Sequence, residues 1–215
     1  MKTIYRNEKV QVFRATCELF KSHSYFIKIL TTGRLYVIDC IISKEKIHAA
    51  MDFFKCKIDA VICTHGHFDH IGCADFIQKK EGCKVFISDL DIGLTQKANF
   101  LLMVCGSQER ISLPDFTSTL AFECDDVYIL ETPGHTKGSI CIGYENLLFT
   151  GDTLFSKSIA KSKLPGENLS DLQNSVRYLF KHFDKETLIF PGHGPSSKLR
   201  KILQENKDLI QLIEK

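Results

Sequence analysis

Four side chains able to bind a metal ion fall within six residues of the sequence: His65, His67, Asp69 and His70. His65 and His67 are separated by one residue, so both can point the same way from an extended turn. Asp69 and His70 are adjacent and must diverge. Two ligand pairs that leave one loop in two directions suit two neighbouring metal ions better than one. Imidazole with carboxylate favours divalent zinc, iron or manganese.

Three more candidate ligands follow apolar runs directly, each beside a glycine: His135, Asp152 and His193. Loops held by strands carry functional side chains disproportionately often, and glycine permits the sharp backbone exit that aims a ligand inward. We therefore expect these three turns and the first segment to converge on one rim of a sheet.

Other residues of the same types lack these surroundings. His23, His48 and His182 are interpreted as ordinary surface or partly packed histidines. Cys63, within an apolar strand pattern, is interpreted as a small core residue rather than a ligand. Asp39 ends another apolar run and has two interpretations: a hydrogen-bonding partner of a metal-binding histidine, or a simple turn-forming aspartate.

Strand patterns and helical patterns interleave along the whole chain, which favours a sheet-centred α/β architecture with helices outside. Strands are predicted at 24–29, 34–38, 60–63, 84–87, 127–130, 139–143, 146–149 and 188–190. Helices are predicted at 47–54, 74–80 and 172–180, with a closing helix over 199–213. The stretch 89–119 stays open, because residues 100–104 fit either a helix turn or a strand.

Composition predicts one globular domain over residues 1–215, since 215 residues of which 44% are hydrophobic can bury one sizeable core. The net charge of +2 gives no support to a nucleic-acid or membrane partner. The nine cysteines contain no C-x-x-C pair, which suits free thiols in a reducing compartment. No signal peptide or membrane span is recognisable, so the cytoplasm is the expected location. The oligomeric state is not indicated.

The segments T-H-G-H-F-D-H, P-G-H-T-x-G-S, L-F-T-G-D-T-L-F and P-G-H-G resemble the metallo-β-lactamase superfamily, and within it the glyoxalase II-like (hydroxyacylglutathione hydrolase-like) hydrolases. The resemblance covers nearly the whole chain and implies a four-layer αββα sandwich with two divalent metal ions at one edge, zinc ahead of iron or manganese. The implied ligands are His65, His67 and His135 for the first ion, Asp69, His70 and His193 for the second, and Asp152 as a bridge between them.

The sequence also departs from glyoxalase II. Those enzymes continue after the last histidine motif into a helical domain that helps to hold glutathione, whereas only residues 194–215 follow here, so no separate C-terminal helical substrate domain is predicted. The family usually has glycine and then a cation after G-D-T-L-F. This chain has Ala160 and Lys161, and Lys163 stands where glyoxalase II tends to have an aromatic residue. The resemblance places Lys161 where the family offers a cation to its substrate, so Lys161 is a candidate substrate contact; the alternative is a solvated lysine cluster with Lys157 and Lys163.

The predicted function is a dinuclear metal-dependent hydrolase of a small-molecule acyl-thioester, such as a hydroxyacylglutathione. Metal binding can lower the pKa of water from about 16 to near 7. A thiol with a pKa of about 8.5 can leave as thiolate, so no strong general acid is required. Asp69 is assigned a proton-relay role in addition to metal binding.

Several alternatives use the same fold. A lactonase would open cyclic esters with the same ligands. A persulfide dioxygenase would hold a single iron ion, which the candidate ligand His193 argues against. A nuclease would need an added RNA-binding or clamp region, and a secreted β-lactamase would need a signal peptide. A non-enzymatic protein stapled by its metals would not need all seven ligands.

Overall fold

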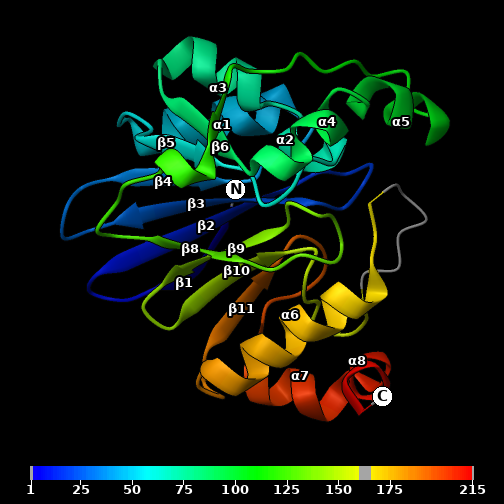
Figure 1. The fold of residues 1–215 in the computed structure, drawn as a ribbon. Helices are drawn as coiled ribbons and strands as arrows, with labels where there is room; N and C mark the ends of the chain where they lie inside the picture. The colour runs from blue at the N-terminus through cyan, green and yellow to red at the C-terminus, as the bar shows by residue number, and fades with distance from the viewer. Residues whose placement is uncertain (1, 160–165, 215) are drawn as a thin grey trace. The chain divides into compact units, whose positions relative to one another are not determined.

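The chain folds into two compact units, Met1–Phe122 and Glu123–Lys215. The computed structural model describes residues 2–159 and 166–214. Each unit contains one β-sheet and its helices, the first coloured blue to green and the second green to red in Figure 1. Among the described residues, no helix has the length and apolar character needed to cross a bilayer.

The sheet of the first unit has its strands in chain order. Its antiparallel part runs from β1 to β4, and its parallel part from β4 to β7. The strands are β1 (Lys2–Arg6), β2 (Val10–Thr16), β3 (His23–Ile29), β4 (Leu35–Ile38), β5 (Ala60–Ile62), β6 (Lys84–Ile87) and β7 (Phe116–Ser118).

Parallel neighbours need crossover connections, and helices supply them. The crossover between β4 and β5 is α1 (Lys44–Phe54), and that between β5 and β6 contains α2 (Phe68–Ile71) and α3 (Ala74–Glu81). The connection from β6 to β7 holds η1 (Asp89–Asp91), α4 (Ile92–Thr95) and α5 (Ala98–Val104), and η2 (Thr119–Ala121) follows β7.

Helix α1 packs its apolar side against the sheet of the first unit. Ser43 caps its N-terminus by accepting a hydrogen bond from the backbone N–H of Lys46 at 3.4 Å. At its other end the Phe54 ring lies edge-on to Phe13, with ring centroids 4.6 Å apart, and 5.7 Å from Phe26. The helix thus covers β2 and β3, and the strands that it connects, β4 and β5, pair in parallel with their carboxyl ends side by side.

The sheet of the second unit also follows chain order. Its strands are β8 (Tyr128–Glu131), β9 (Ile140–Tyr144), β10 (Leu147–Gly151), β11 (Leu188–Pro191) and β12 (Ser197–Lys198). Among the described strands of this sheet, only β10 and β11 pair in parallel, and α6 (Leu169–His182) is part of the crossover between them. The core of this unit joins the sheet to the apolar sides of α6, α7 (Leu199–Glu205) and α8 (Lys207–Glu214).

The predicted strands and the first three helices are confirmed, with ends shifted by up to three residues. The prediction of a single closing helix was wrong, because α7 ends at Glu205, Asn206 is not helical, and α8 begins at Lys207. The Asn206 side chain donates hydrogen bonds to the backbone carbonyls of Phe155 at 3.1 Å and Ser158 at 2.8 Å, and its backbone departs from helical geometry. Strands β1, β2, β7 and β12 were not predicted, and the undecided stretch around Phe100 is the helix α5.

Candidate metal centre

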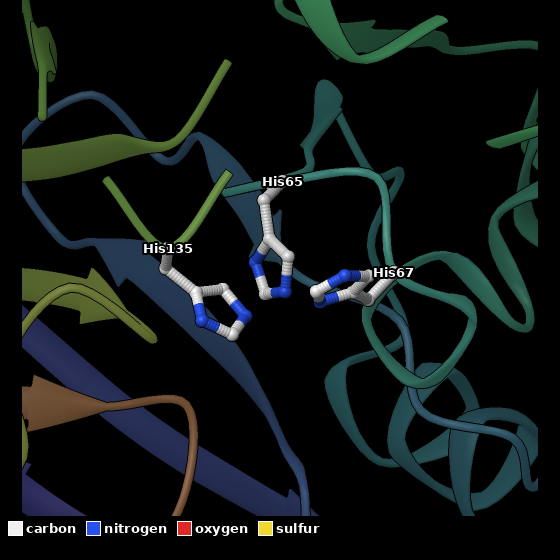
Figure 2. Close-up of side chains that lie close together, drawn as sticks. All are labelled: His65, His67 and His135. Atoms are coloured by element: carbon white, nitrogen blue, oxygen red, sulfur yellow. The ribbon is translucent and has the colours of Figure 1, made fainter. Parts of the chain in front are cut away.

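The loop after β5 carries the first group of candidate ligands. His65 and His67 lie before α2, with ring centroids 4.8 Å apart and planes nearly perpendicular (Figure 2). Asp69 and His70 lie on α2, where Asp69 Oδ2 is 3.7 Å from His70 Nε2. The His65 and His70 rings are 4.1 Å apart, and all four side chains are buried. In the first unit the structure therefore brings these four predicted residues together.

Asp39, just past the end of β4, orients two of these histidines. Its Oδ2 accepts hydrogen bonds from His70 Nδ1 at 2.8 Å and from the Thr64 hydroxyl at 2.8 Å. Because the Thr64 hydroxyl donates its proton to Asp39, its oxygen can accept from His65 Nδ1, 3.0 Å away. Both imidazoles then carry their proton on Nδ1 and offer the Nε2 lone pair to a metal ion.

The contact with His70 decides between the two interpretations of Asp39 in favour of the partner of a candidate metal ligand. Asp39 also has a left-handed backbone, with φ of 57°, so it turns the chain as well. Its oxygens accept from His70 and from both the backbone and the hydroxyl of Thr64. One buried carboxylate therefore satisfies three donors beside the ligand loop.

Asp91 supports the same loop and was not identified from the sequence. Its side chain accepts a hydrogen bond from the Gly66 backbone N–H at 2.8 Å, between His65 and His67, and is 1% exposed. A Cβ atom at Gly66 would lie 2.9 Å from the Asp91 carbonyl oxygen, so only glycine fits this approach. Asp91 lies in the stretch that the sequence left undecided, and no local pattern distinguishes it from a helix-capping aspartate.

The second unit holds the other three candidate ligands. His135 lies between β8 and β9, Asp152 follows β10, and His193 follows β11. Asp152 Oδ2 is 3.5 Å from His135 Nε2 and 3.5 Å from His193 Nε2. One carboxylate oxygen of Asp152 is therefore close to both imidazoles. His135, the residue of this unit that is drawn in Figure 2, is 2% exposed.

Helix α6 fixes the turn that carries His135. The backbone of Gly134 has φ of 142°, and a Cβ atom there would lie 2.2 Å from the backbone N and Cα of Leu172. The Gly134 carbonyl accepts from the backbone N–H of Asn168 at 2.7 Å, and the Ser175 hydroxyl donates to the Pro133 carbonyl at 2.7 Å. The glycine of the P-G-H motif is thus required by contact with the helix.

The donors in each unit fit divalent metal ions. Buried imidazoles with buried carboxylates are the ligands that zinc, iron and manganese accept, and buried carboxylates are stabilised by a metal cation. Cys63 is fully buried at the end of β5, and burial followed by the nearby Asp39 raises the pKa of its thiol well above the ordinary value. This complete burial in the sheet agrees with the core role predicted for Cys63.

The remaining histidines have local roles. His23 lies 2.9 Å from the Thr16 hydroxyl, His48 pairs with Asp52 one helical turn away, and His182 Nδ1 lies 3.0 Å from a carbonyl of its own helix. The predicted substrate residue Lys161, with Ala160 and Lys163, lies outside the described residues.

Residues 18–193 match the family described as the metallo-beta-lactamase superfamily, and the chain belongs to it. This range spans both units and all seven candidate ligands. The expected fold class, the αββα metallo-β-lactamase fold, is confirmed by this match and by the structural likeness below.

Three similar proteins illustrate the range of the family. The probable polyketide biosynthesis zinc-dependent hydrolase PksB of Bacillus subtilis is 24% identical over 202 residues, covering 92% of this chain and 86% of PksB. The probable metallo-hydrolase MJ0888 of Methanocaldococcus jannaschii is 33% identical over 146 residues, covering 64% of this chain and 70% of that protein. The crystal structure of TTHA1623 in a di-iron-bound form has a TM-score of 0.82 and 26% identity, covering 91% of this chain and 98% of TTHA1623.

Proposed function

We propose that this protein is a dinuclear metal-dependent hydrolase of acyl-thioesters, such as a hydroxyacylglutathione. The observation that carries the proposal is one His/Asp group in each unit: Asp69 Oδ2 lies 3.7 Å from His70 Nε2 beside His65 and His67, and Asp152 Oδ2 lies 3.5 Å from both His135 Nε2 and His193 Nε2. In the proposed centre His65, His67 and His135 hold one ion, Asp69, His70 and His193 hold the other, and Asp152 bridges them.

The hydrolase class is supported by the similar proteins. PksB is described as a zinc-dependent hydrolase and MJ0888 as a metallo-hydrolase. TTHA1623 has been crystallised in a di-iron-bound form. This supports the proposal of a site for two ions and leaves iron as an alternative to zinc. We propose zinc as the resident metal, because the imidazole-rich donor set suits zinc and the proposed hydrolysis needs no redox chemistry.

The chemistry follows from the donors that the chain provides. Two divalent ions supply positive charge for a developing oxyanion and make a water molecule ionisable near neutral pH. Asp69 has a second oxygen beyond the one near His70, which allows it to relay a proton while binding metal. Asp39 and Thr64 keep His70 and His65 in the ligand tautomer throughout. A thioester fits because its thiol leaves without a strong general acid.

Lys161 is proposed to bind a carboxylate of the thiol carrier. Such a contact exists in the ground state and the transition state alike, so Lys161→Ala should raise KM and leave kcat nearly unchanged. An equal KM for wild type and variant on a charged thioester at low salt would remove Lys161 from the substrate site.

The decisive experiment combines a substrate panel with metal analysis on one sample. Purified protein is assayed with a hydroxyacylglutathione, a thioester of an uncharged thiol, a lactone and a persulfide, and its metal content is measured. We expect thioester hydrolysis with close to two ions per chain. His67→Ala should lower the rate about a thousandfold or more, whereas His48→Ala, on the exposed side of α1, should not.

Other outcomes have distinct meanings. Lactone opening without thioester hydrolysis would support a hydrolase whose substrate is a lactone and not a thioester. Oxygen consumption with a persulfide, together with one iron ion per chain, would mean that the protein is a dioxygenase and not a hydrolase. Full activity of His67→Ala would mean that the ligand loop is not catalytic.

A further inference from the structure

We propose that Thr132 and Thr153 are positioning residues, whose hydroxyl groups hold His135 and Asp152 at metal-binding separation. The inference rests on the proposed metal centre and concerns the second unit alone. Thr132 lies three residues before His135, and Thr153 directly follows Asp152. Neither side chain could be singled out from the sequence, where both look like ordinary turn threonines.

The two hydroxyl groups form a buried link between the ligand turns. Thr132 Oγ1 is 3.0 Å from Thr153 Oγ1, and the Thr153 hydroxyl also lies 3.4 Å from the Thr132 carbonyl oxygen. Thr132 Oγ1 is 3.3 Å from the sulfur of Cys141 on β9. Thr132 is 0% exposed and Thr153 is 3% exposed, so water does not compete for these contacts.

Sheet topology explains why these two turns need such a link. The His135 turn leaves β8 and the Asp152 turn leaves β10, but β8 and β10 both pair with β9 and not with each other. Strands two positions apart are about 9.6 Å from each other in a sheet. The backbone ladder therefore does not tie His135 to Asp152, and the threonine pair reaches across the end of β9.

The third ligand of this unit does not need the link. His193 follows β11, which pairs directly with β10, and the Gly192 backbone N–H donates to the Gly151 carbonyl at 2.7 Å. Loss of the threonine hydroxyls should therefore loosen the His135–Asp152 distance of 3.5 Å and leave the Asp152–His193 distance in place. In the proposed centre His135 and His193 bind different ions. The ion bound by His135 should therefore be held more weakly, and the ion bound by His193 should be less affected.

The test replaces each hydroxyl by a methyl group of similar size. Thr153→Val and Thr132→Val should weaken the affinity for at least one zinc ion about tenfold or more, measured by chelator competition. Their cobalt-substituted forms should show altered visible absorption. Thr153→Ser keeps the hydroxyl and should restore both properties. Thr187→Val is the matched control, because Thr187 is equally buried but lies at the opposite end of β11.

Three results would overturn the inference. The first is that the valine variants bind both ions with wild-type affinity and spectrum. The second is that Thr187→Val weakens metal binding as much as they do. The third is that Thr153→Ser fails to restore metal binding. Circular dichroism of the metal-free proteins separates a lost fold from a loosened site, and Thr132→Val provides a second variant if Thr153→Val does not fold. Wild-type protein that bound no metal would instead overturn the proposed function, and this inference with it.

Discussion

The Asp39 carboxylate accepts three hydrogen bonds, from the Thr64 backbone, the Thr64 hydroxyl and His70 Nδ1. An asparagine side chain has only one oxygen, so Asp39→Asn must turn an N–H group toward at least one of these donors. Its left-handed backbone, with φ of 57°, is one that asparagine tolerates, so strain is not added. We expect metal affinity to fall about 10- to 100-fold.

Chelator competition measures this affinity, and Asp59→Asn is the control. Asp59 is an exposed residue of the same unit that accepts from the Leu35 backbone N–H at 2.7 Å, just before β5 and away from its ligand end. Unchanged affinity in Asp39→Asn, or an equal loss in Asp59→Asn, would contradict the role assigned to Asp39.

The cysteine residues should differ in their reactivity toward alkylating reagents, because their burial differs. Burial raises the pKa of Cys73 to about 11, of Cys83 to about 11 and of Cys141 to about 12. These thiols stay protonated at pH 8, whereas the reactive species is the thiolate. Iodoacetamide at pH 8 should therefore label the exposed Cys105 first, as peptide mass spectrometry can show. Labelling of Cys141 before Cys105 in the folded protein would contradict this burial.

At the residue scale, spacing alone identified the candidate ligands, because a metal centre needs several donors at strand ends and their glycines lie beside them in sequence. Asp91, Thr132 and Thr153 were missed. Each acts through a contact with a residue of another turn, and such contacts exist only once the sheet has formed.

At the scale of elements, the close approach of α6 to the His135 turn leaves no room for a side chain at Gly134. A methyl group at Gly134 would lie 2.2 Å from the backbone of Leu172, and φ of 142° is strained for alanine. We expect Gly134→Ala to lower the free energy of unfolding by about 3 kcal/mol or more. Gly82→Ala is the matched control, since Gly82 has φ of 66° but open space around it. It should lose only about 1 to 2 kcal/mol.

Denaturant unfolding of the two variants provides the comparison. Equal losses would mean that backbone strain alone, and not the approach of α6, makes glycine necessary at position 134.

The break between α7 and α8 depends on one buried side chain. Asn206 is 0% exposed, donates to two carbonyls of the segment after Asp152, and accepts from the Leu209 backbone N–H at 3.0 Å. Asn206→Ala leaves these groups unsatisfied and should destabilise the protein by about 2 kcal/mol, with faster hydrogen exchange in α8. Asn168→Ala removes the exposed cap of α6 and should have the smaller effect, about 1 kcal/mol. The reverse order would contradict the anchoring role of Asn206.

Apolar runs and helical spacing predicted most strands and helices, but not the point where a helical pattern is interrupted. Strands β4 and β5 are short apolar runs buried on both faces, and β3 and β6 each contain such a run beside a lysine. The edge strand β1 contains charged residues and shows no such run. The closing helix was predicted as one because Leu199, Ile202 and Leu209 keep helical spacing across Asn206, and the hydrogen bonds that interrupt it come from distant carbonyls.

At the scale of the whole molecule, the proposed ligands belong to both units, so metal binding should stabilise the complete fold. Free metal at 100 times its Kd adds about 2.7 kcal/mol per site. Removal of the metals by a chelator should lower Tm and abolish hydrolysis, and zinc should restore both. A Tm that does not respond to chelation, in protein shown to contain metal, would mean that the ions are not bound to the folded state preferentially.

Chain order in both sheets has a consequence for how the protein is made. Each strand pairs only with its neighbours in chain order, so a strand can join its sheet once the preceding strand is in place. Such a sheet can grow strand by strand as the polypeptide leaves the ribosome, at about 5 to 20 residues per second. All the strands of the first unit leave the ribosome before those of the second. His193 is the last of the proposed ligands to emerge, which makes capture of the full metal complement a late event in biogenesis.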